Sequence, residues 1–264
     1  RHLTIIWPAG FVLPGVTVTG DVTLSAGGAV SQSGPIDAAG LNLQGSGAYT
    51  LNDGTNDVAT ISALTSNSIE YWDAADLVVG TVNGITGLDS GGNPIILVIG
   101  GNLTGGPVDG SSLDLDVTGN IGDLDDGLLV RDPAPTYFTT LVSSLDVTLN
   151  APGAEAAIDN SGALTIADLI PDAGGTASIL VQNDNSIAVT TWSPVAGEND
   201  NPGLIATAGN ITLPGAGTNL GTGTLRIDAA ADVLDADTDL GNYAITAGHL
   251  DFSAGASENL LTTI

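Results

Sequence analysis

Short segments in which apolar residues alternate with polar ones recur along the whole chain. Examples are Val22–Leu24, Leu41–Leu43 and Tyr49–Leu51, each with apolar residues two positions apart. This spacing is typical of a β-strand with one buried face. Gly, Ser, Asn and Asp fill the gaps between the segments, and such residues readily form tight corners. The pattern therefore predicts many short strands joined by abrupt turns.

The apolar segments also recur at a nearly constant distance in the first half of the chain. Their centres lie near residues 23, 42, 60, 78, 97 and 115, a spacing of about 18 to 19 residues, at the short edge of the range for solenoid repeats. A chain that coils on itself, with one short strand on each side of a coil, explains this spacing better than long hairpins do. We therefore predict an all-β fold, a β-solenoid of roughly 12 coils of about 20 residues each.

The same pattern predicts one elongated solenoid over residues 1–264, with three irregular segments. Residues 1–19 contain Pro8 and Pro14 and are interpreted as an entry or cap segment. Residues 131–140 and 193–203 are interpreted as loop insertions because their prolines are poorly tolerated in a central strand.

Composition narrows the range of partners. The chain has 30 Asp and Glu residues against three Arg and no Lys, which gives a formal net charge of −27. A protein without a basic face is a poor ligand for nucleic acid. No apolar run reaches the roughly 18 residues that a membrane-spanning helix needs, so neither nucleic acid nor membrane insertion is expected. The residues from Leu3 to Val18 lack the basic start of a signal peptide.

Several phrases of the first half resemble a known family. They are GDVTLSAGGAVSQSG from Gly20, LVVGTVNGITG from Leu77, and GGNLT ending at Thr104. Residues 20–104 are similar to the repeat region of filamentous-haemagglutinin-type bacterial exoproteins, and residues 145–252 share the style more loosely. The resemblance implies a right-handed parallel β-helix, secretion to the surface of a Gram-negative cell, and roles in adhesion, aggregation or biofilm. It implies no catalytic residues.

Acidic clusters are the candidate metal sites. The run Asp235, Asp237, Asp239 begins like a calcium-binding loop, but Leu240 stands where the loop needs Gly and Thr246 where it needs Glu. A second cluster contains Asp123, Asp125 and Asp126. We interpret both first as solvated acidic edges, with weak calcium bridging as the alternative; no other cofactor is expected.

Two further kinds of site follow from short motifs. Asn102 and Asn210 head Asn-x-Thr sequences and are glycosylation candidates. The tryptophans and tyrosines are expected mainly to pack in the core, with a sugar-stacking face as the alternative.

An enzyme of the polysaccharide-cleaving β-helix type is the third alternative for function. A lyase of this type needs a basic residue beside calcium, and a hydrolase needs two carboxylates that flank the bond. The three arginines lie far apart in the sequence, and no motif supplies these groups in order. We therefore expect no enzymatic activity.

The expected function is that of an extracellular structural or adhesive β-solenoid that assembles end to end with copies of itself. The open ends of a solenoid present strand edges that template pairing. The assembly candidates are apolar residues near the two ends: Leu3, Ile5, Leu260, Leu261 and Ile264. The alternatives are one segment of a larger secreted adhesin that binds cell-surface glycans, and the polysaccharide-cleaving enzyme.

Overall fold

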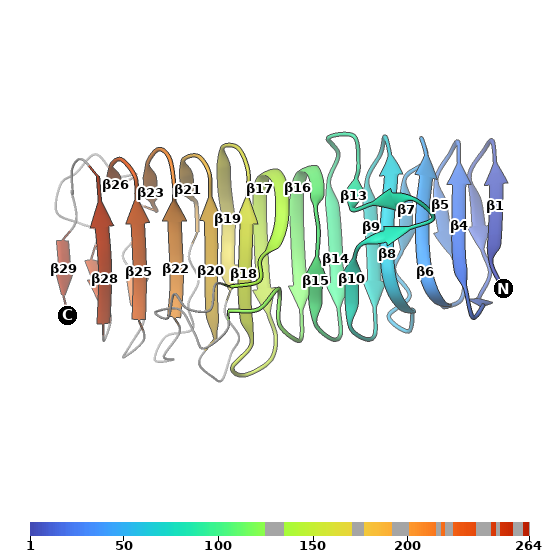
Figure 1. Ribbon diagram of the computed structural model, residues 1–264, viewed down its shortest axis with the longest axis horizontal. Coiled ribbons are helices and arrows are strands. Elements are labelled where there is room, and N and C mark those ends of the chain that lie inside the picture. Colours follow the sequence, from blue (N-terminus) through green and yellow to red (C-terminus); the bar gives the residue numbers. More distant parts are fainter. Residues whose placement is uncertain are drawn as a thin grey trace. The chain divides into compact units, whose positions relative to one another are not determined.

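The computed structural model describes residues 1–124, 135–170, 177–191, 201–214, 218–219, 224–235, 244–246, 249–255 and 261–263. Every regular element in this part of the chain is a β-strand, and strands of successive coils pair in parallel (Figure 1). The predicted parallel β-solenoid is confirmed. No helix that could cross a membrane occurs among the described residues. The chain divides into two compact units: residues 1–119 with 138–141, and residues 120–137 with 142–264.

Unit 1 is built from two main parallel ladders, and within each of them one strand stacks on the next. The first ladder contains β1 (Leu3–Trp7), β4 (Asp21–Ala26), the second half of β6 (Ile36–Gly45), the second half of β8 (Asp57–Thr65), β10 (Leu77–Val79), β13 (Leu88–Asp89), β15 (Leu103–Gly105) and β16 (Val108–Val117). The second contains β2 (Phe11–Leu13), β5 (Val30–Gln32), β7 (Tyr49–Leu51), β9 (Ile69–Asp73), β14 (Ile95–Ile99) and the end of β16. β3 (Val16–Thr17) pairs with the start of β6.

Unit 2 repeats this arrangement. β18 (Glu155–Asn160), β20 (Ser178–Asn183), β22 (Asn201–Ala206), β25 (Thr224–Ala229) and β28 (His249–Ala254) form one ladder. The end of β17 (Phe138–Leu149) forms the other with β19 (Leu164–Ile170), β21 (Ile187–Val189), β23 (Ile211–Leu213) and β26 (Val233–Asp235). β24 (Thr218–Asn219), β27 (Ala244–Thr246) and β29 (Leu261–Thr263) form a third, short ladder.

The core consists of inward side chains that stack in rows from coil to coil. Leu24, Leu43 and Ala63 are direct ladder partners, and each is at most 1% exposed. Rows of this kind explain why the sequence repeats Val, Ile and Leu two residues apart. Corners need residues without bulk: Gly45 has φ +95°, and a Cβ there would strike the carbonyl of Ala26.

Coil length is less regular than the sequence pattern predicted. Leu3 pairs with Val22, Val22 with Leu41 and Leu41 with Ile61, which lie 19, 19 and 20 residues apart. The constant spacing then fails, because Leu77 pairs with Leu103, 26 residues later.

The extra length in that coil comes from an inserted hairpin, β11 (Thr81–Val82) with β12 (Ile85–Thr86). In unit 2 the coils are longer throughout. Ala156 pairs with Ile179, and Leu204 with Ile227, each 23 residues apart.

The three irregular segments predicted from sequence need partial correction. Residues 1–19 contain β1, β2 and β3, which pair with β4, β5 and β6 as one more coil. β17 begins at Phe138, inside the predicted loop 131–140, and β22 begins at Asn201, inside the predicted loop 193–203. Pro202 is tolerated because it pairs with Ile179 of β20, whereas the ladder from β22 to β25 begins only at Gly203. Residues 131–134 and 193–200 lie outside the described residues.

Candidate interaction surfaces

The first coil of unit 1 exposes apolar side chains at positions that are buried in the next coil. Leu3 and Ile5, both predicted assembly residues, are half-buried, and Trp7 is 54% exposed. Their ladder partners Val22, Leu24 and Ala26 are at most 2% exposed. The inward row of this coil is therefore apolar and incompletely covered.

The first coil is also apolar on its outer side. Ile6 is 74% exposed and Val12 is 60% exposed. Both point outward, and the residues that follow them in the ladder are Ser25 and Ser31. The outer surface thus changes from isoleucine and valine to serine within one coil.

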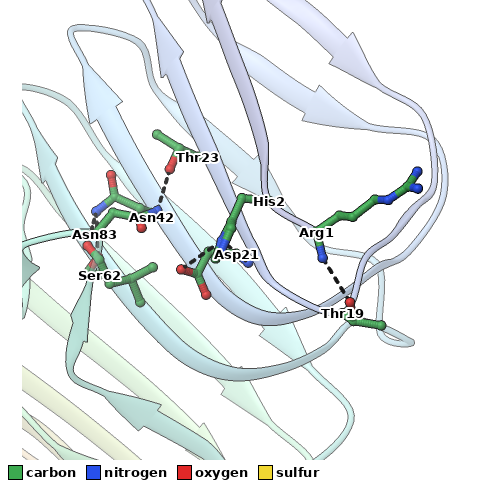
Figure 2. Close-up of polar contacts among 9 residues, drawn as sticks. Arg1, His2, Thr19, Asp21, Thr23, Asn42, Ser62 and Asn83 are labelled. Carbon is green, nitrogen blue, oxygen red and sulfur yellow. Dashed lines mark hydrogen bonds and ion pairs between the residues drawn. The ribbon is translucent and has the colours of Figure 1, made fainter.

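Polar contacts tie the start of the chain to the second coil (Figure 2). The N-terminal ammonium of Arg1 donates to Thr19 Oγ1 at 2.9 Å. The Asp21 N–H donates to His2 Nδ1 at 3.1 Å, and Asp21 Oδ2 lies 3.3 Å from the same nitrogen. Because His2 Nδ1 accepts the Asp21 N–H, this arrangement fits a neutral imidazole with its proton on Nε2.

The hairpin β11–β12 folds back over the outer face of the preceding coils. Its turn residues Asn83 and Gly84 have φ of +51° and +83°, as a two-residue type I′ turn requires. Asn83 Nδ2 donates to Thr23 Oγ1 of β4, 60 residues earlier, at 2.9 Å (Figure 2). Asn-Gly between apolar residues is the sequence signal for such a hairpin, and the coil pattern alone had hidden it.

The hairpin buries polar side chains that would otherwise face solvent. Asn42 and Ser62 follow Thr23 in one outward row of the ladder, yet both are fully buried. Asn42 Nδ2 donates to Ser62 Oγ at 2.6 Å and to the Val82 carbonyl at 3.2 Å. The hairpin is therefore held by side-chain donors that reach its backbone.

Unit 2 has a comparable covering segment. Asp123 and Thr136 exchange backbone hydrogen bonds at 2.8 Å, and the Ala157 N–H donates to the Ile121 carbonyl at 2.7 Å. Leu124 packs with Ala157 and Leu180 on the outer side of β18 and β20. Both units thus carry a segment that lies over an outward row.

The acidic candidate residues for calcium are only partly described. Asp123 lies in the bridge to Thr136, and Asp235 ends β26. Asp125, Asp126, Asp237 and Asp239 lie outside the described residues. Within the described part, no three His, Asp or Glu side chains come close enough to hold an ion.

Pairs of carboxylates nevertheless stack along the ladders. Asp37 pairs with Asp57, and Asp89 pairs with Asp109. Desolvation raises the pKa of Asp109, and the neighbouring charge of Asp89 raises it further. The pKa of Asp114 is raised by desolvation and by Asp116. These stacked pairs disfavour full ionisation.

The remaining candidates lie at corners and ends. Asn102 is exposed after the turn that leads into β15, and Asn210 Oδ1 accepts the N–H of Asp232 in the next coil at 3.1 Å. Leu261 lies in β29, where it pairs with Ala244. Leu260 and Ile264 lie outside the described residues.

The aromatic residues divide between core and surface. Tyr49 and Tyr71 are at most 1% exposed. Tyr71 donates its hydroxyl to Asp73 Oδ2 at 2.6 Å, and that carboxylate also accepts the N–H of Val58 and of Ala75. Burial raises the pKa of Asp73 despite these hydrogen bonds. Trp7 and the half-buried Trp72 are the described tryptophans, and they lie on different ladders.

Comparison with known proteins identifies repeats but no function. Residues 2–65 match a family model described as repeats of unknown function (DUF5649). No curated protein matches the chain, and no solved structure matches it. The match covers the first coils of unit 1, where the ladder is most regular.

Proposed function

We propose that this protein is an extracellular structural or adhesive β-solenoid without enzymatic activity. In this proposal it assembles end to end with copies of itself into filaments at a bacterial surface or in a biofilm matrix. The observation that carries the proposal is the first coil of unit 1, whose inward residues Leu3, Ile5 and Trp7 are more exposed than their partners one coil later.

A further coil stacked on β1 would bury these side chains. It would also pair with the main-chain edge of β1, as in other cases of strand addition. Apolar burial is worth about 25 cal/mol per Å², so covering half-exposed Leu, Ile and Trp side chains would favour association. A head-to-tail contact of this kind extends indefinitely and makes a filament.

A second candidate keeps the same edge but changes what covers it. In a larger secreted adhesin that binds cell-surface glycans, a neighbouring coil of the same polypeptide would cover β1. The regular repeat in residues 2–65 favours this candidate as much as the first, because repeats of this kind stack on more of their own kind.

Electron microscopy of the purified chain separates the two candidates. Long filaments of uniform width support end-to-end assembly, and separate particles of one size support the adhesin segment. Leu3→Asp should abolish filaments if β1 is the contact, whereas Ser31→Asp, a control on an outward position of β5, should leave them intact. Filaments that persist in Leu3→Asp would contradict the proposed contact.

A further inference from the structure

Unit 1 has one lateral face that differs from the rest of this acidic protein. We call it the hairpin face and define it by the outward positions of the first ladder and by the hairpin. Its members are Thr4, Ile6, Asp21, Thr23, Ser25, Gly40, Asn42, Gln44, Thr60, Ser62, Leu64, Val78 and residues 81–86.

Charge is nearly absent from the hairpin face. Among these positions only Asp21 carries a carboxylate, and that carboxylate lies beside His2. The chain as a whole has 30 acidic residues, but residues 1–52 contain only Asp21 and Asp37. The face ends where Leu64 meets Asp89 in the ladder.

Large apolar side chains are exposed on the same face. Ile6 is 74%, Leu64 51% and Val78 40% exposed. Ile6 and Leu64 belong to one outward row, and Val78 lies in the coil that leads into the hairpin. The hairpin itself contributes only Thr, Val, Asn, Gly and Ile.

We propose that the hairpin face is a lateral contact between two copies of this chain. Two unit charges 4 Å apart repel by about 1 kcal/mol even in water, so copies of a chain with a net charge of −27 repel each other wherever carboxylates meet. On the hairpin face they approach with almost no carboxylates between them. A basic partner would instead be drawn to the acidic faces elsewhere on the chain.

The contact is self-complementary, because the same face serves on both copies. Such an isologous contact closes as a dimer and does not propagate. It is therefore separate from the end-to-end contact of β1, and either can fail without the other.

Sedimentation velocity over a concentration series at physiological salt tests the proposal. The wild-type chain should show reversible dimers, and Leu64→Asp and Ile6→Asp should each shift the dissociation constant upward at least tenfold. Both side chains are largely exposed, so circular dichroism should show the wild-type fold. Ser31→Asp adds the same charge on another face and should dimerise like wild type.

Two results would overturn the proposal. One is a wild-type chain that stays monomeric at every concentration. The other is a Leu64→Asp variant that dimerises as strongly as Ser31→Asp. If filaments also form, Leu64→Asp should keep them by electron microscopy while losing their side-by-side pairing.

Discussion

Single residues determine whether a coil can stack, because each inward side chain touches its counterparts above and below. Leu43 is fully buried between Leu24 and Ala63. Leu43→Asp would remove its apolar contacts and bury a charge, at a cost of about 3–5 kcal/mol or more. This is comparable with the whole stability of many domains.

We therefore expect Leu43→Asp to abolish the cooperative thermal transition measured by circular dichroism. Ser31→Asp, which places the same group on a half-buried outward position, should melt close to wild type. A normal melting curve for Leu43→Asp would show that the inward row has been assigned wrongly.

The buried carboxylate of Asp73 makes a pH-dependent prediction. Its pKa is raised in the folded state by burial, so its contribution to stability is present at acidic pH and is lost as the pH rises through the folded-state pKa. The hydrogen bond from Tyr71 lowers that pKa. Tyr71→Phe should therefore raise it further and destabilise the protein more at neutral pH than at about pH 4.

Tyr49→Phe is the matched control. The Tyr49 hydroxyl donates to the Leu24 and Gln44 carbonyls, which do not titrate. Both variants should lose about 1–3 kcal/mol in urea unfolding at neutral pH, but only the loss in Tyr71→Phe should shrink on acidification. Equal pH dependence in the two variants would contradict the role given to Asp73.

At the scale of elements, the sequence predicted the strands well and their spacing only in part. Segments such as Val22–Leu24 and Leu41–Leu43 revealed the inward rows because alternation reports burial directly. The constant spacing failed at Val78, since an insertion between two coils leaves the alternation on either side unchanged. The loops predicted from proline were too long because Pro202 stands where a strand is paired on one side only.

The covered outward row could not be predicted from coil periodicity. Asn42 and Ser62 are ordinary surface residues in the sequence, and only the hairpin, which arrives some 20 residues later in the chain, buries them. The exposed first coil was predicted from Leu3 and Ile5. Its outward members Ile6 and Val12 were not, because exposure depends on which coil a residue belongs to.

Docking of the hairpin depends on the glycine beneath it. A Cβ on Gly40 would lie 2.9 Å from Val82 Cγ1 and 2.8 Å from Asp21 Oδ1. Gly40→Val should displace the hairpin and destabilise unit 1 by about 1–3 kcal/mol. Hydrogen exchange at the hairpin amides should accelerate, whereas Gly54→Ala, with only an ordinary contact to Trp72 at 3.9 Å, should leave it unchanged. Unaltered protection in Gly40→Val would mean that the hairpin does not rest on Gly40.

At the scale of the whole molecule, acidic charge is distributed unevenly. Residues 1–52 hold two of the 30 acidic residues, and the other 28 follow. Folding brings carboxylates of successive coils together, as in the pairs Asp37–Asp57 and Asp89–Asp109. Partners in neighbouring strands lie about 4.8 Å apart, so each pair stores repulsion that the unfolded chain relieves.

Calcium should relieve that repulsion better than sodium does. Calcium takes oxygen ligands at about 2.3–2.6 Å, so one ion can lie between two stacked carboxylates, whereas sodium mainly screens them. We expect millimolar calcium to raise the melting temperature more than sodium chloride of equal ionic strength. Asp37→Asn should reduce the calcium-specific part of the increase because it dissolves one pair. Glu70→Gln should not, because the ladder neighbours of Glu70 are Thr50 and Ile96. Equal shifts in calcium and sodium would leave only screening, and an equal loss in both variants would show that calcium acts on total charge rather than on the stacked pairs.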